Sequence, residues 1–235
     1  MPRRSRQLEL DLRAVPRWGG RRAGAGRKPG IRRRDPHGRR APLAARHPCH
    51  VTIRVRRDVP SLRSRRFVAE AERSFRAMRK RGRFRLIHYS IQRNHVHAIV
   101  EAASARDLSN GMKALAARLA RAVHRVFRRV GRALDDRSHV RVLRTPREVR
   151  NAIAYVLLNA RRHSAQLSVR LGATASIDPA SSGRWFDGWR ASPHAIAPDA
   201  PVAVPRTWLL AVGWRRFGRI DPGEVPGGRT RSGRP

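Results

Sequence analysis

The feature that most constrains the fold is the order of strand and helix patterns along residues 51–143. Alternating apolar residues or β-forming side chains predict strands over 51–55, 84–91, 94–101 and 139–143. Apolar residues spaced three and four apart predict amphipathic helices over 62–81, ending at Gly82, and from 104 or 105 to 130, ending at Gly131. The helical stripes consist of Phe67, Ala71, Phe75 and Met78, and of Leu108, Met112, Leu115, Leu119, Val123, Val126 and Val130.

This order, β-α-β-β-α-β, is the ferredoxin-like arrangement. A further helix follows the fourth strand, and its start is well defined. Thr145 is the candidate N-cap, Pro146 takes the first helical position and Glu148 completes a capping box. We therefore predict an α+β fold, with a ferredoxin-like core, an additional helix and flanking basic tails.

A histidine motif, Asn94-His95-Val96-His97, lies within the third predicted strand. Side chains alternate between the two faces of a strand, so His95 and His97 project side by side. Imidazole binds metal ions while neutral at physiological pH. The pair is therefore a candidate for two adjacent metal ligands, the alternative being ordinary surface or core histidines.

The chain is strongly basic, with 54 Lys and Arg against 16 Asp and Glu and a formal net charge of +38. Only three of these cations are lysines, and arginine suits bidentate contacts with phosphate. Nucleic acid is the expected partner. The sequence has no long apolar run and no apolar stretch at its start, which predicts a cytoplasmic protein without membrane segments.

Two groups of basic residues are candidate phosphate contacts. One side of the second predicted helix carries a row of arginines, which is either a surface that follows a nucleic-acid backbone or a solvated face. The N-terminal segment adds basic residues among glycines and proline, typical of a solvated arm. The candidates are Arg118, Arg121, Arg125 and Arg128 in the helix, and Arg22, Arg27 and Lys28 in the arm.

The third predicted helix carries Tyr155 and Asn159, which are four residues apart and share a face. A tyrosine on an amphipathic helix is commonly a core residue, but here it accompanies the histidine pair. A metal ion held by His95, His97 and the amide oxygen of Asn159 would offset negative charge on a scissile phosphate. Tyr155 could then attack phosphorus through its phenolic oxygen. Imidazole and oxygen ligands are compatible with Mg²⁺ or Mn²⁺.

Asn-His-Val-His on a strand followed by Tyr-Val-Leu-Leu-Asn on a helix resembles the single-tyrosine HUH transposases, and within them the REP-associated tyrosine transposases. The resemblance covers about residues 46–190, including Asp178-Pro-Ala-Ser-Ser182 and Phe186-Asp-Gly188. It implies an enzyme that cuts and rejoins single-stranded DNA at hairpins through a 5′-phosphotyrosine and needs a divalent metal. By this resemblance Tyr155 is the nucleophile and His95 and His97 are the paired histidines. The chain departs from the usual pattern at Gln92-Arg93, where Met-Pro is common, and at Ala160, where proline is common.

The predicted organisation has four parts: a basic disordered arm over 1–46, the HUH catalytic domain over 47–165, an accessory segment over 166–220 and a disordered tail over 221–235. Trp185, Trp189, Trp208 and Trp214 lie in the accessory segment. With the neighbouring arginines they either stack on unpaired bases or cap the core. We expect a monomer or homodimer.

Two other functions fit the same sequence. A domesticated protein could keep the fold and bind structured DNA without cutting it. An RNA-binding protein could use a similar four-stranded sheet, but the histidine strand lacks the exposed aromatic residues which that function requires.

Overall fold

A computed structural model describes residues 42–79, 82–135, 138–160, 177–191 and 198–226 of the 235-residue chain. All of these lie in one compact unit, Asp35–Pro235. The arm residues Arg22, Arg27 and Lys28 lie outside the described residues.

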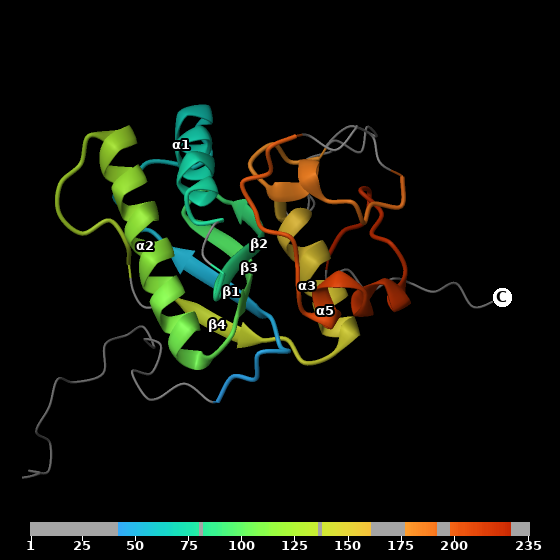
Figure 1. Ribbon diagram of the computed structural model, residues 1–235. Coiled ribbons are helices and arrows are strands. Elements are labelled where there is room, and N and C mark those ends of the chain that lie inside the picture. The colour runs from blue at the N-terminus through green and yellow to red at the C-terminus, as the bar shows by residue number, and fades with distance from the viewer. Residues whose placement is uncertain (1–41, 80–81, 136–137, 161–176, 192–197, 227–235) are drawn as a thin grey trace, which may run out of the picture. The chain divides into compact units, whose positions relative to one another are not determined.

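Four strands form one antiparallel sheet in the order β2-β3-β1-β4, which confirms the predicted ferredoxin-like topology. Its elements are visible in Figure 1. In chain order they are β1 Cys49–Arg54, α1 Arg65–Arg76, β2 Phe84–Ile91, β3 His95–Ala102, α2 Ala105–Phe127 and β4 His139–Val142.

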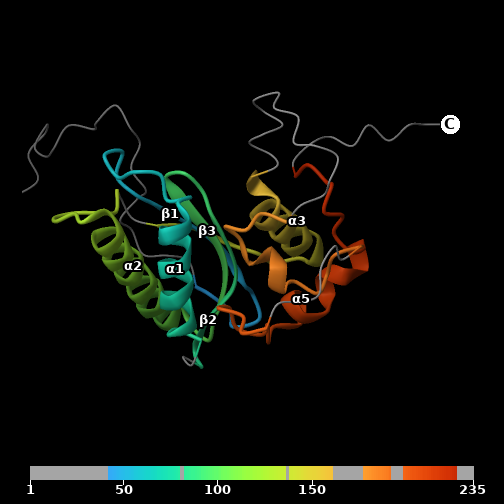
Figure 2. The same cartoon turned by 90° about the horizontal axis from the view of Figure 1, so that it is seen from above.

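The helices α1 and α2 cover one face of the sheet, as Figure 2 shows. Their predicted apolar stripes pack there against inward-facing strand residues such as Val51, Ile53 and Tyr89. Burial of this apolar surface is the main source of stability for this half of the domain. Serine side chains begin both helices: Ser64 accepts a hydrogen bond from the backbone N–H of Phe67, and Ser104 from that of Asp107.

The second helix ends earlier than its apolar pattern predicted. It stops at Phe127, and Arg128 takes the left-handed conformation with φ 52°. This turn lets the Arg129 guanidinium bind Asp58, at 2.6 Å from the carboxylate. Val130, predicted on the buried stripe, is consequently 92% exposed. The first helix is also shorter than predicted: Ser64 caps it, so it begins at Arg65, and it ends at Arg76.

Helix α3 (Pro146–Leu157) covers the opposite face of the sheet (Figure 2), and its predicted capping box is present. It packs into a second apolar core with short C-terminal elements. These are the 3₁₀ turn η2 (Ser182–Trp185), helix α5 (Trp208–Ala211) and the 3₁₀ turn η3 (Gly213–Phe217). The buried rings of Phe186, Trp189 and Trp214 fill this core.

Polar contacts fix the C-terminal segment to the sheet. The buried carboxylate of Glu101 on β3 accepts hydrogen bonds from the Arg85 side chain and from the backbone N–H groups of Arg206 and Thr207. Glu224 binds the Arg150 guanidinium on α3 at 2.7 and 2.8 Å, although it belongs to the predicted C-terminal tail. The segment 177–226 is thus integrated with the sheet wherever the structure describes it.

The Asp178–Ser182 segment forms an extra contact beside β2. Ser181 forms an isolated bridge with Ser90, and the Ser182 hydroxyl accepts a hydrogen bond from the Tyr89 backbone N–H. Asp178 receives two hydrogen bonds from Arg63, at 3.0 and 2.8 Å. This sequence therefore joins the edge strand to the chain just before α1.

Among the described helices, none has the length and apolar character needed to cross a bilayer.

Candidate functional site

The two histidines of the motif lie side by side on β3, on the sheet face that α3 covers. Their Nε2 atoms are 2.9 Å apart. His97 is buried, whereas His95 is partly open to solvent. The geometry thus suits two adjacent ligands that point toward the same space.

The opposite nitrogen of each ring contacts the protein. Asn94 Oδ1 lies 2.8 Å from His95 Nδ1 and accepts a hydrogen bond when that nitrogen carries the ring proton. His97 Nδ1 lies 3.0 Å from Thr52 Oγ1 and 3.3 Å from His50 Nε2. Such partners fix the orientation of a ligating imidazole. Thr52 stands opposite His97 in the β1–β3 register, so the sheet itself provides this contact.

His50 forms part of the site, although it was not among the residues selected from the sequence. Its ring lies 5.2 Å from that of His97 and 5.6 Å from that of Tyr155, between centroids. Burial, together with the positive charges of His139 and Arg141, lowers the pKa of His50 to about 4. Its imidazole is therefore neutral near pH 7.

Tyr155 projects from α3 toward the histidines. Its ring meets that of His97 edge to face, with centroids 5.1 Å apart and planes at 78°. The side chain is half-buried. The structure thus brings together three residues that the sequence selected from two separate motifs, His95, His97 and Tyr155.

Asn159 does not occupy the same helix as Tyr155, contrary to the prediction. Helix α3 ends at Leu157, because Leu158 has φ −107° and ψ 16° and breaks the helical repeat. The Asn159 side chain is fully buried, and within the described part of the chain neither amide atom has a hydrogen-bond partner. An unsatisfied buried polar group costs about 1–3 kcal/mol, so this amide is available to an additional ligand.

The described residues contain no group of three or more His, Cys, Asp or Glu side chains arranged around one metal position. A metal ion at the histidine pair would therefore take its other ligands from elsewhere. The buried amide oxygen of Asn159 and oxygens of a bound substrate are suitable donors for a hard cation.

Three residues of the predicted arginine row lie on α2, which covers the sheet face opposite the histidines (Figure 2), and the fourth, Arg128, caps the end of the helix. Arg121 and Arg128 are exposed, Arg118 is half-buried and Arg125 pairs with Glu70 at 3.1 Å. On the histidine face, by contrast, the exposed Arg54 stands opposite His95 in the β1–β3 register. Basic side chains therefore occur on both faces of the sheet.

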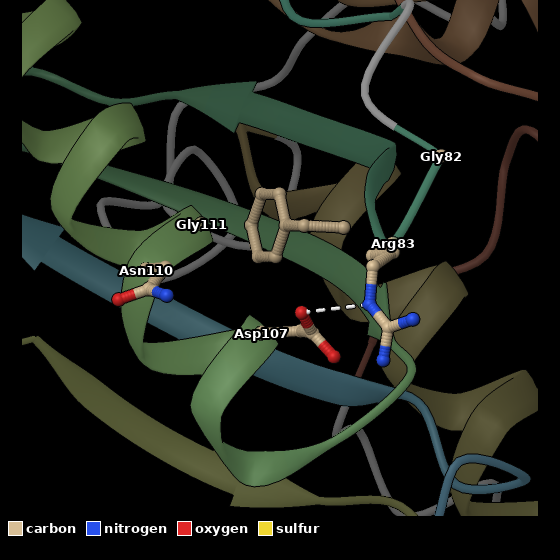
Figure 3. A pocket seen from close by; sticks show the side chains of 6 residues that line it. Gly82, Arg83, Asp107, Asn110 and Gly111 are labelled. Carbon is tan, nitrogen blue, oxygen red and sulfur yellow. Dashed lines mark hydrogen bonds and ion pairs between the residues drawn. The ribbon is translucent and has the colours of Figure 1, made fainter.

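A separate hollow of about 260 Å³ lies where β2 and α2 begin (Figure 3). Its walls include Arg83 and Asp107, which form an ion pair at 3.0 Å, and the buried residue Phe84. Gly111 leaves room for the Phe84 ring, because a Cβ at position 111 would lie 2.0 Å from a ring atom. Phe84 pairs with Ala102, so this hollow lies at the other end of β3 from His95.

Two solved structures are similar to parts of this chain. A REP-associated tyrosine transposase solved with a REP hairpin is 15% identical, with a TM-score of 0.47, over 63% of this chain and 83% of its own. A bacterial tRNA(His) guanylyltransferase-like protein solved with GTP is 14% identical, with a TM-score of 0.40, over 58% and 72%. Among curated proteins, none matches the sequence significantly.

The family model described as "Transposase IS200 like" matches residues 45–139. The match extends from just before β1 to the first residue of β4, and so includes the histidine pair and its partners on β1 but ends before Tyr155. Over this segment, with the paired histidines at its centre, the chain is similar to the IS200-like transposases.

Proposed function

We propose that the protein is a transposase that cuts and rejoins single-stranded DNA next to a hairpin through a covalent 5′-phosphotyrosine at Tyr155. The observation that supports this most directly is the contact between the Tyr155 and His97 rings, 5.1 Å apart, beside the converging histidine nitrogens. The phenol is thus next to two potential metal ligands, within a chain whose residues 45–139 match a transposase family model.

In this proposal His95 Nε2, His97 Nε2 and the amide oxygen of Asn159 would hold a divalent cation, Mg²⁺ or Mn²⁺. The unpartnered buried amide of Asn159 fits such a role. When bound, the cation would act as a Lewis acid that stabilises negative charge on the scissile phosphate.

The chemical step uses the phenol of Tyr155 as nucleophile. Its oxygen loses a proton and bonds to phosphorus, while the bond from phosphorus to the 3′-oxygen of the preceding nucleotide breaks. The products are a 5′-phosphotyrosine and a free 3′-hydroxyl, which takes up a proton. Attack by a 3′-hydroxyl on the phosphotyrosine reverses the step and rejoins DNA.

The remaining residues of the site orient these groups. Neutral His50 packs against both Tyr155 and His97 and adds no charge that would compete with a cation. Arg54, exposed opposite His95, is suited to contact a phosphate of the strand. The net charge of +38 favours the binding of a polyanionic substrate.

The test mixes the full chain with labelled hairpin DNA that carries a single-stranded flank, in Mn²⁺, and detects a covalent adduct after denaturation. The wild type should form the adduct, and Tyr155→Phe should form none while binding the hairpin normally. His95→Ala should also bind without forming an adduct. A wild-type protein that binds but never forms an adduct would instead be a DNA-binding protein without cleavage.

Tyr89→Phe is the control, since Tyr89 is the only other tyrosine. It lies in the core between the sheet and helices α1 and α2, where its hydroxyl donates a hydrogen bond to Glu72 at 2.8 Å. This variant should lose some stability but keep its adduct. Persistence of the adduct in Tyr155→Phe would contradict the proposed nucleophile.

A further inference from the structure

Two aromatic side chains of the C-terminal segment remain at the surface, unlike their neighbours. Trp208 on α5 is 50% exposed and Phe217 on η3 is 43% exposed, whereas Trp189 and Trp214 are almost fully buried. Val212, between them, is also exposed. Three of the six exposed large apolar residues in the described chain therefore lie within ten consecutive positions, 208–217.

Each of these exposed rings has an arginine beside it. The guanidinium carbon of Arg216 lies 5.1 Å from the centre of the Trp208 ring, and that of Arg147, at the start of α3, lies 5.1 Å from the Phe217 ring. We call Trp208, Val212, Phe217, Arg147 and Arg216 the aromatic–arginine patch.

Two other arginine–tryptophan pairs in the same segment differ from the patch, because each of their arginines also binds a carboxylate. Arg184, stacked on Trp185 at 4.0 Å, binds both carboxylate oxygens of Glu72. Arg215, beside the buried Trp214, binds Asp187 at 2.8 Å. Those pairs are neutralised within the protein and serve its packing.

Arg147 and Arg216 have no such carboxylate among the described residues, and their aromatic partners are exposed. A surface with uncompensated positive charge next to open aromatic rings fits a ligand that supplies both negative charge and flat apolar surfaces. Unpaired nucleic acid has this chemistry, because its phosphates and bases alternate along the strand.

The local backbone fixes the orientation of Trp208. A Cβ at Gly213 would lie 2.6–3.0 Å from three atoms of the indole ring, so only glycine lets the ring rest against the chain here. The ring is therefore held in place before any ligand arrives, which reduces the entropy lost on binding.

The patch is also linked to the proposed catalytic helix. Arg147 lies in the first turn of α3, eight residues before Tyr155. At a rise of 1.5 Å per residue the two positions are about 12 Å apart along the helix axis. A strand attached at Tyr155 could reach this surface with its flanking nucleotides.

We propose that the aromatic–arginine patch binds unpaired DNA that flanks the hairpin, with Trp208 and Phe217 stacking on bases and Arg147 and Arg216 contacting adjoining phosphates. This inference rests on the proposed function, but it concerns a surface outside the histidine site.

The test measures binding by fluorescence anisotropy, without cleavage, on two probes. One is a blunt hairpin and the other is the same hairpin with a single-stranded flank. The wild type should prefer the flanked probe. Trp208→Ala should weaken binding to that probe by about 5- to 150-fold, the range for loss of one stacked base, and leave the blunt probe unaffected. Phe217→Ala should act in the same direction.

Two further variants separate stacking from general effects. Trp208→Phe should retain most of the affinity because it keeps an aromatic face, whereas Trp208→Leu should not. Val204→Ala, at an apolar residue that is 81% exposed outside the patch, should bind both probes like the wild type.

Three outcomes would overturn the inference. In the first, Trp208→Ala binds the flanked probe as tightly as the wild type. In the second, Trp208→Ala loses the same affinity for both probes. In the third, Trp208→Ala sediments differently from the wild type, which would identify the patch as a contact between protein chains. Wild-type protein that binds neither probe would overturn the proposed function itself.

Discussion

The hydroxyl of Thr52 is a hydrogen-bond partner of Nδ1 of His97. A metal ligand must use a bare nitrogen, so His97 can bind through Nε2 only if its proton is on Nδ1. Thr52 Oγ1, 3.0 Å from Nδ1, can accept a hydrogen bond from that N–H group. Asn94 does the same for His95. The two small polar side chains thus present both Nε2 atoms to one position.

Removal of the Thr52 hydroxyl should therefore weaken metal binding without disturbing the fold. Loss of a partner of this kind typically lowers metal affinity about 10- to 100-fold. We expect Thr52→Val, which keeps the side-chain shape, to show this loss in a calorimetric titration with Mn²⁺. Thr52→Ser keeps a hydroxyl and should retain most of the affinity; equal affinities of Thr52→Val and the wild type would exclude this role.

His88 on β2 makes stability depend on pH. Its ring meets Phe186 edge to face at 5.3 Å, and burial lowers its pKa to about 4. The unfolded chain, with a pKa near 6.5, binds the proton more readily, so stability is full above pH 6.5 and falls as the pH drops toward 4.

The lowered pKa of His88 should reduce the free energy of unfolding by at most about 2 kcal/mol at pH 5. This value is an upper limit because part of the residue remains exposed. Urea unfolding of the wild type and of His88→Leu at pH 7 and pH 5 measures this contribution. The wild type should lose more stability than the variant between the two values. Parallel losses would show that His88 is not protonated on unfolding in this range.

At the scale of elements, a single buried carboxylate connects the sheet to the C-terminal segment. Glu101 is 2% exposed and accepts hydrogen bonds from Arg85 and from the start of α5. It holds the segment that covers α3 and carries the aromatic–arginine patch. The Arg150–Glu224 pair, which is more exposed, adds a second connection.

Glu101→Ala should leave the Arg85 charge and the Thr207 backbone N–H without this partner. Removal of one member of a buried ion pair destabilises a protein by about 3–5 kcal/mol. We expect a lower urea midpoint and faster proteolysis within 198–226 than in the sheet. Glu224→Ala is the matched control and should cost about 1 kcal/mol or less; similar losses in both variants would contradict the role given to Glu101.

Helix starts and strand faces could be predicted from the sequence because their signals are local. The capping box at Thr145 and the alternation around His95 and His97 each involve a few neighbouring residues. The roles of Thr52 and His50 depend instead on the β1–β3 register, which joins positions 45 residues apart. The helix end at Leu157 likewise gave no signal, so the position of Asn159 relative to Tyr155 could not be predicted.

At the scale of the whole molecule, positive charge lies on both sides of the sheet. Arg54 borders the histidine site, while the exposed Arg121 lies on α2 and the exposed Arg128 caps the end of that helix, on the other face. One strand at the histidines cannot contact both groups directly, because the sheet lies between them. We therefore expect the α2 arginines to contact a different part of the DNA, such as the hairpin stem.

This division predicts how binding responds to salt. Each phosphate contact with a duplex stem contributes about 0.9 to the slope of log affinity against log salt. Arg121→Gln combined with Arg128→Gln should lower that slope by about 1.8 and leave adduct formation by bound DNA unchanged, because neither residue reaches Tyr155. Binding measured over a range of salt concentrations, followed by adduct yield at saturating DNA, separates the two effects.

The matched control replaces Arg73 and Arg83 by glutamine. Both side chains are largely exposed, at 74% and 76%, but each is paired with a carboxylate, Glu70 and Asp107 respectively. Their replacement removes the same formal charge while taking away arginines already engaged within the protein, so the slope should change little. If both double variants lower the slope equally, the α2 row acts only through net charge; if neither does, DNA does not contact this face of the molecule.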